Sequence, residues 1–264
     1  MHSSQATTGP LHQTTPPPGQ LWAGVARSDI TTQAPDARIR DPLFARVITL
    51  TNNQITLAII AMDAVAIGGI CDIPDTFLPA LHARLEAELN IPASHVLVSA
   101  THTHPPGRIL CDNDLLLDRV VLAVRQAAGH RVPVRIGVGT GQETRITMNR
   151  TLRLKDGSHW TLRHTNPSPP DEEVESLGPV DPQIGVIRID HLDGRPLAVI
   201  YNFACHPRFG DPAGSITANF VGHASTIIEQ TLGQNVMALF LQGAAGDVID
   251  IHFKDFNRLR DVQP

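Results

Sequence analysis

The stretch Ser99-Ala100-Thr101-His102-Thr103-His104-Pro105-Pro106-Gly107 directly follows a compact apolar run at positions 95–98. The apolar run predicts a buried strand, and the Pro/Gly loop behind it suits the edge of a sheet. His102 and His104 are two residues apart, so in an extended segment both side chains point to one side. Two such imidazoles can hold a metal ion, or one can hold it while the other meets a substrate. The alternative is a pair of unrelated loop histidines.

The segments around this stretch alternate between strand and helix patterns. Helices are predicted from apolar residues repeating every three or four positions, and strands from short apolar or alternating runs. The expected strands are 22–31, 43–50, 55–62, 95–100, 132–139, 184–190, 197–205 and 236–242, and the expected helices are 74–90, 113–128 and 219–232. Two hairpins are expected, one joining 43–50 to 55–62 at Asn52-Asn53 and one joining 184–190 to 197–205 at Asp193-Gly194. Between them, 144–162 reads as irregular strand with a hairpin turn at Asp156-Gly157, and 166–182 reads as an exposed loop.

The order of these segments predicts an α/β fold with mixed β-sheets flanked by helices. Strand, helix and strand follow one another over 95–139 and again over 197–242, which predicts two βαβ units with parallel strands. The histidine loop would then lie at the carboxyl end of a parallel strand. Open α/β sheets place their binding sites at that end.

Composition narrows the function classes. A net charge of −5 with no basic run gives no reason to expect a nucleic-acid partner, and no apolar segment is long enough for a membrane span. Thirteen histidines mildly favour metal or acid–base chemistry. Residues 1–20 are rich in Ser, Thr, Gln and Pro and carry no visible signal peptide, so we expect a disordered tail, a domain over 21–264 and, by default, a cytoplasmic location.

Other strand ends also carry groups capable of chemistry. The strand at 197–205 is followed by His206-Pro207, and the strand at 236–242 is followed by the small-residue turn Gly243-Ala244-Ala245-Gly246-Asp247. Arg150 lies between the two histidine segments in the sequence, and Asp63 ends another strand, where it is as readily a turn or capping residue. Convergence of such groups from separate strand ends is what a site requires. Unrelated turn residues are the alternative.

Five short motifs, in order over about 230 residues, resemble the N-terminal domain of the neutral/alkaline (non-lysosomal) ceramidase family. The most distinctive are Thr-His-Thr-His and His-Pro. The matching stretches are Ala23-Gly24-Val25-Ala26-Arg27-Ser28-Asp29-Ile30-Thr31, Ser99-Ala100-Thr101-His102-Thr103-His104, Asn149-Arg150-Thr151, Phe203-Ala204-Cys205-His206-Pro207 and Gln242-Gly243-Ala244-Ala245-Gly246-Asp247.

This resemblance implies a zinc-dependent hydrolase that cleaves the amide bond of ceramide, with a lipid or other small molecule as its substrate. It implies that His102 and His206 are zinc ligands, and that His104 and Arg150 contact the substrate oxygen and its developing negative charge. Neutral imidazoles suit Zn²⁺, while an arginine and a further histidine can stabilise an oxyanion. The resemblance also places Gly246, Asp247 and Ile249 at the substrate.

The sequence departs from the family pattern in ways that bear on catalysis. Active ceramidases carry a serine in a Gly-Asp-x-Ser-Pro motif, and Ile249 stands in its place here. Two further family ligands, a Glu and a Tyr, lie beyond the equivalent of Pro264, so the domain is expected to be incomplete at its C-terminal end, with Asp63, Asp247, Asp250 or His252 completing the site if zinc is held.

Three functional interpretations follow from these departures. The first is a ceramidase-like zinc hydrolase that cleaves an amide or ester with metal-activated water. The second is a catalytically inactive member that binds a lipid or small ligand. The third is a structural fragment that folds poorly without the part it lacks.

Overall fold

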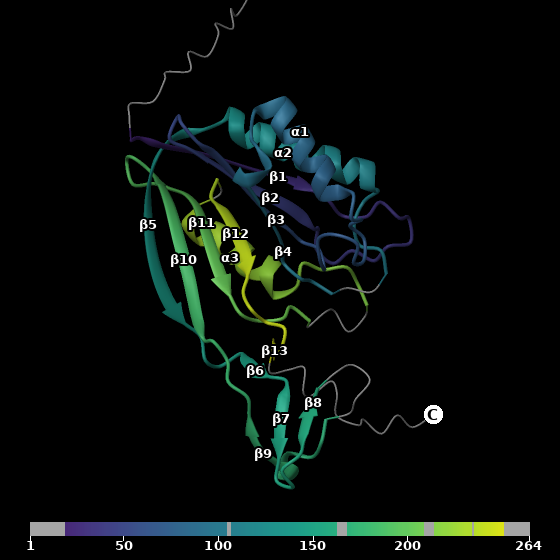
Figure 1. Ribbon diagram of the computed structural model, residues 1–264. Coiled ribbons are helices and arrows are strands. Elements are labelled where there is room, and N and C mark those ends of the chain that lie inside the picture. Colours follow the sequence, from purple (N-terminus) through teal and green to yellow (C-terminus); the bar gives the residue numbers. More distant parts are fainter. Residues whose placement is uncertain (1–18, 105–106, 163–167, 209–213, 234, 251–264) are drawn as a thin grey trace, which may run out of the picture.

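The computed structural model describes residues 19–104, 107–162, 168–208, 214–233 and 235–250 (Figure 1). The tail predicted at 1–20 therefore lies outside the described residues except for its last two positions. No helix in these ranges is long and apolar enough to cross a membrane.

Eight strands form one mixed sheet in the order β12-β11-β10-β5-β1-β2-β3-β4. Their bounds are β1 Leu21–Asp29, β2 Phe44–Thr51, β3 Thr56–Met62, β4 Val96–Ala100, β5 Val132–Gln142, β10 Gln183–His191, β11 Pro196–Phe203 and β12 Met237–Gln242. Neighbours are antiparallel except for the parallel pairs β3/β4 and β11/β12. The predicted hairpins at 43–62 and 184–205, and the mixed α/β class, are confirmed.

The sheet coils on itself at β5, where Val134 is paired with Leu21 of β1 on one side and with His191 of β10 on the other. Beyond Val134, β5 leaves β1 and continues beside β10 alone. Because of this change of partner, the part of the sheet formed by β10, β11 and β12 folds back over the other strands, and β12 lies against β2, β3 and β4. Apolar side chains from both halves, including Ile48 and Leu239, form one buried core between them.

Three helices cover the outer faces of this coiled sheet (Figure 1). Helices α1 (Phe77–Leu89) and α2 (Asn113–Gly129) lie side by side, with α2 packed on β1 and β2, and α3 (Asn219–Leu232) packs beside β12. The contact between α2 and β1 is close because β1 has a glycine there. A Cβ on Gly24 would lie 1.9 Å from the Ala127 carbonyl oxygen of α2, so only glycine fits. A short 3₁₀ helix, η1 (Ala93–His95), precedes β4.

The small strands form a separate group at the end of β5 and β10 (Figure 1). β6 (Thr147–Asn149) pairs with β13 (Val248–Asp250), and β7 (Thr151–Leu154) pairs with β8 (His159–Thr161) and β9 (Val174–Leu177). The hairpin predicted at Asp156-Gly157 is confirmed. The exposed loop predicted at 166–182 is wrong in part, because η2 (Asp171–Glu173) and β9 lie within it.

One of the two predicted βαβ units is confirmed and the other is wrong. β11, α3 and β12 form a parallel unit as expected. β4, α2 and β5 do not, because β4 pairs with β3, and three strands, β1, β2 and β3, lie between β4 and β5. The crossover that makes β4 parallel to its neighbour is α1, between β3 and β4. The histidine loop therefore still follows a parallel strand.

A buried ion pair fixes the end of β3 next to this loop. Arg46 Nη1 lies 2.7 Å from Asp63 Oδ2, and the same oxygen accepts the Phe44 N–H at 2.9 Å. The Asp63 side chain is fully buried, so each charge depends on the other for compensation.

Asp63→Asn is expected to lower the free energy of unfolding by about 3–5 kcal/mol, because it leaves the Arg46 charge buried without its counter-ion. Denaturant unfolding measures this loss. The matched change Asp193→Asn removes a carboxylate from an exposed pair with Arg195 and should leave the midpoint almost unchanged. Equal midpoints for Asp63→Asn and the unmodified chain would contradict the structural role.

Candidate functional site

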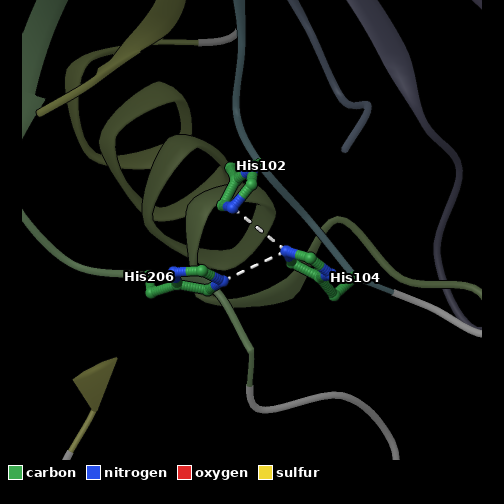
Figure 2. A group of neighbouring side chains, drawn as sticks. All are labelled: His102, His104 and His206. Carbon is green, nitrogen blue, oxygen red and sulfur yellow. Dashed lines mark hydrogen bonds between the residues drawn. The ribbon is translucent and has the colours of Figure 1, made fainter. Parts of the chain in front are cut away.

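Three imidazoles meet where β4 and β11 end (Figure 2). His104 Nε2 lies 3.1 Å from His102 Nε2 and 3.1 Å from His206 Nε2. One ring nitrogen of each histidine lies within 4.8 Å of the other two, and among the described residues this is the group of His, Cys, Asp and Glu side chains placed to hold a metal ion. The coiled sheet thus brings together histidines that are a hundred residues apart in the sequence.

The loop that carries the first two histidines is held through His102 and Thr103. His102 has a left-handed backbone with φ of 67°. That conformation is uncommon for a non-glycine residue. Its backbone N–H donates to the Ala64 carbonyl at 2.9 Å, and its ring Nδ1 lies 2.5 Å from the Val65 carbonyl oxygen. On the next residue, the Thr103 hydroxyl donates to the Thr217 carbonyl at 2.9 Å. Both faces of the histidine loop are therefore anchored to neighbouring backbone.

His206 is held by the small-residue turn that follows β12. It is 6% exposed, and its ring Nδ1 lies 3.2 Å from the Ala245 carbonyl oxygen. Its backbone N–H donates to the Val248 carbonyl at 3.1 Å. The turn can approach because Gly243 lacks a side chain, since a Cβ there would lie 2.8 Å from the Ala204 backbone nitrogen. Gly243 therefore allows the turn to lie close to the end of β11, the strand that leads to His206.

The hydrogen bonds of the rings decide where their lone pairs point. A carbonyl oxygen only accepts, so the Nδ1 atoms of His102 and His206 carry protons, and in the neutral rings the Nε2 lone pairs face His104. His104 Nε2 can donate a proton to one of them and not to both. At least one of the two Nε2 lone pairs therefore receives no proton from His104, and a cation between the rings would bind all of them. This donor set fits a metal ion bound through Nε2, with carbonyls orienting the rings.

The charge state of His206 agrees with that role. The pKa of His206 is lowered to about 4, mainly by burial and then by the neighbouring His102, Arg150 and Arg208, against an opposing contribution from the Ala245 carbonyl. The ring is therefore neutral at pH 7. A neutral imidazole is the form that ligates metal.

Arg150 lies at the edge of the same site. Its guanidinium donates to the Gly246 carbonyl and its backbone N–H donates to the Asp247 carbonyl at 2.8 Å. Asn149 Nδ2 donates to Asp247 Oδ2 at 2.9 Å and to the Pro179 carbonyl. The Asn-Arg motif is thereby tied to the turn that orients His206, although Gly246 and Asp247 themselves are exposed.

Ile249 occupies a different environment from the histidines. Its side chain is fully buried with Met148, Leu152 and Leu162 in an apolar cluster between the small strands. Its backbone forms a bridge with His206. The contact with substrate expected for Ile249 remains a prediction, and its packing gives it a structural task.

Ile249→Ser restores the hydroxyl of the family motif and is expected to destabilise the fold. Removing the buried side chain costs about 2–5 kcal/mol, and an unpaired hydroxyl in an apolar cluster adds to the loss. Denaturant unfolding measures the change, with Ile249→Val as the conservative comparison at roughly 0.5–1.5 kcal/mol. A serine variant as stable as the unmodified chain would show that position 249 tolerates a polar group.

The other candidate ligands are placed away from the three rings or outside the described residues. Asp63 is paired with Arg46, and Asp247 binds Asn149. Asp250 lies in β13, where its charge raises the pKa of Cys205 beyond the effect of burial. His252 lies outside the described residues. None of the three aspartates joins the histidine group.

Sequence reasoning missed the groups that orient the rings. Val65 and Ala245 act through backbone carbonyls, so their side chains carry no signal. Arg208 was also missed, although it stands directly after His206-Pro207 and its charge reaches His206. A basic residue next to a candidate ligand was the available signal.

Comparison with known proteins identifies the fold. No protein-family model and no curated protein matches the chain. Among solved structures, a neutral ceramidase from Pseudomonas aeruginosa matches with a TM-score of 0.69 at 20% identity, covering 88% of this chain and 39% of that chain. A ceramidase complexed with C2 matches with a TM-score of 0.68 at 19% identity and the same coverage.

The chain spans about two fifths of the length of these two structures. At this level of identity the likeness concerns the fold. Over most of its length the chain therefore has the fold of the neutral ceramidase structures, as its resemblance to that family implied.

Proposed function

We propose that the chain is a zinc-dependent hydrolase that cleaves an amide bond, as in an N-acylsphingosine, or an ester bond. The observation that carries the proposal is the convergence of three Nε2 atoms, with the rings of His102 and His206 oriented by backbone carbonyls. The ceramidase fold supports it, because the histidines lie on the motifs that the sequence shares with that family.

In this proposal His102 and His206 hold the zinc through Nε2, and the Val65 and Ala245 carbonyls keep each ring in the required tautomer. Zinc, when bound, supplies a polarised carbonyl and a water whose pKa is lowered toward about 7. Burial of His206 keeps its imidazole neutral, so protons do not compete with the metal at neutral pH.

His104 and Arg150 stabilise the negative charge that develops on the substrate oxygen. Arg150 is anchored by its bond to the Gly246 carbonyl, on the turn that orients His206, and it remains protonated at any pH of interest. His104 lies 3.1 Å from both proposed ligands, so it can reach an oxygen bound at the same centre. The same distances suit His104 as a third zinc ligand, and catalytic zinc sites usually have three.

The second candidate is a protein that binds a lipid or small ligand without turnover. It is favoured by Ile249, which stands at the position of the family serine and whose apolar side chain is buried. Isoleucine has no group that can be activated as a nucleophile.

Turnover assays with and without zinc separate the two candidates. We expect the zinc-loaded chain to hydrolyse a simple ester or amide and to lose this activity when a chelator removes the metal. Because the family serine is absent, turnover of a short-chain ceramide should be weak. Binding of ceramide by the zinc-loaded chain, with no turnover of either substrate, would favour the ligand-binding candidate and contradict the hydrolase.

A further inference from the structure

A cavity of about 550 Å³ lies between helix α3 and the strands β1 and β2. Helix α3 lines it with residues between Gly222 and Gln230, and the opposite wall consists of Arg27 of β1 and residues between Asp41 and Arg46. None of the three histidines of the candidate metal site lines this cavity. The cavity is therefore a second place on the molecule where a small ligand has room.

Two arginines lie together at one end of the cavity, and each has a carboxylate partner. Arg27 and Arg46 are directly opposite each other in the β1–β2 ladder, and both guanidinium groups lie over the ring of Phe44, at 4.9 and 5.2 Å from its centroid. Arg27 Nη1 lies 3.1 Å from Glu229 Oε2, and Arg46 Nη1 lies 2.7 Å from Asp63 Oδ2. Because both guanidinium groups are neutralised in this way, the cavity is not an anion site.

Arg46 nevertheless has a hydrogen-bond donor to spare at this end. The residue lines the cavity and is 4% exposed, and its Nε atom has no hydrogen-bond partner among the described residues. A buried donor without an acceptor costs free energy, which an oxygen atom of a ligand would recover.

The other end of the cavity carries a carboxylate without a cation. Asp41 Oδ1 accepts the Ala218 N–H at 2.7 Å, while Asp41 Oδ2 is shielded from solvent and has no hydrogen-bond partner in the described ranges. No basic side chain in the part of the chain that the structure describes forms an ion pair with Asp41. A shielded charge of this kind is weakly screened and favours a positively charged partner.

The two ends are separated along α3. Asp41 Oδ1 lies 3.5 Å from the position that a Cβ on Gly222 would take, whereas the arginine pair is anchored at Glu229. At a rise of about 1.5 Å per residue, Gly222 and Glu229 are about 10 Å apart along the helix axis. A ligand that reaches both ends therefore has an extended shape.

We propose that this cavity binds a small, extended organic cation, with its ammonium group paired with Asp41 and an oxygen acceptor at its far end bound by Arg46. The ligand supplies the counter-ion that Asp41 lacks and the acceptor that Arg46 lacks. Neither contact involves zinc or the histidine centre, so this site and the proposed hydrolase can fail independently.

Titration of the chelator-treated chain, followed by NMR at pH 7, tests the assignment. The probes are ε-aminocaproamide and ε-hydroxycaproamide, which have the same length and differ by an ammonium group against a hydroxyl. We expect ε-aminocaproamide to bind roughly 10- to 100-fold more tightly, the range of a hydrogen bond to a charged group. Hexylamine, which has no oxygen acceptor for Arg46, should bind about 10-fold more weakly than ε-aminocaproamide.

Asp41→Asn should remove the preference for the ammonium probe, because the amide keeps the shape of the side chain and still accepts the Ala218 N–H. Asp36→Asn is the matched control, since Asp36 is exposed, does not line the cavity and changes the net charge equally. Equal losses in both variants would indicate general attraction of cations to a chain of net charge −5 and would overturn the site. An unchanged preference in Asp41→Asn, or no detectable binding of ε-aminocaproamide to the unmodified chain, would also overturn it.

A second variant tests the cavity if Asp41→Asn fails to fold. Gln230→Trp places a large ring at an exposed position that lines the cavity, and it should weaken binding of ε-aminocaproamide by at least about 10-fold. Ile227→Trp is its control, because Ile227 is an exposed α3 residue outside the cavity lining. Equal affinities of the two tryptophan variants would contradict binding in this cavity.

Discussion

His206→Ala is expected to weaken zinc binding by more than about 100-fold, since changes to residues that merely orient a ligand already cost about 10- to 100-fold. His206 is buried, its Nδ1 is occupied by the Ala245 carbonyl, and its Nε2 points at His104. Alanine removes this nitrogen, and none of the aspartates that the structure describes is placed to replace it. Titration of zinc into the chelator-treated chain, in competition with a chromophoric chelator, gives the affinity.

The control is His159→Ala, which removes an exposed histidine from β8 and should leave the zinc affinity unchanged. Equal affinity of His206→Ala and the unmodified chain would place the metal elsewhere. A fall of similar size in both variants would indicate weak binding spread over surface histidines.

Arg150→Ala is expected to lower turnover by about 10²–10³-fold, the effect of removing one oxyanion donor. The guanidinium is fixed by the Gly246 carbonyl, on the turn that orients His206. Zinc content should stay at the level of the unmodified chain, because arginine does not ligate the metal. Initial rates on a simple ester, normalised to bound zinc, give the effect, and Arg153→Ala on β7 is the exposed control.

His104→Ala resolves the role of the third ring. As an oxyanion donor, His104 affects turnover by a similar factor and leaves zinc content unchanged. If His104 is instead a zinc ligand, His104→Ala lowers the zinc content, and activity falls together with it. The 3.1 Å distances to His102 and His206 suit both roles, so zinc content measured beside turnover separates them.

Local pattern was sufficient to predict most elements of the fold. The helices were found from their apolar stripes, and the hairpins from Asn-Asn or Asp-Gly turns between apolar or alternating runs. The parallel partner of β4 was predicted wrongly. A helix lies on each side of β4 in the sequence, so either α1 or α2 could connect it to a parallel neighbour, and the sequence pattern does not show which one does. β9 was missed because a short, mostly exposed strand in a Pro- and Glu-rich segment has no apolar alternation.

The side chains of the site were predicted from the sequence, but the backbone carbonyls that orient them were not. His102, His104 and His206 were selected because strand ends converge, and the structure brings their rings together. The bend at Val134 that makes this possible has no single-residue signature, since it is a change of pairing partner within β5. The resemblance placed Ile249 at the substrate, which stays a prediction. Its burial was not foreseen, because it depends on the pairing of β13 with β6, which is not visible in a three-residue strand.

X-ray absorption at the zinc edge of the zinc-loaded chain tests the central claim most directly, because it reports the ligand atoms themselves. The proposed centre predicts nitrogen ligands at about 2.0–2.1 Å with the outer-shell scattering of at least two imidazole rings. That signature should be absent from His206→Ala. A first shell of oxygen or sulfur without imidazole scattering would contradict zinc binding by His102 and His206.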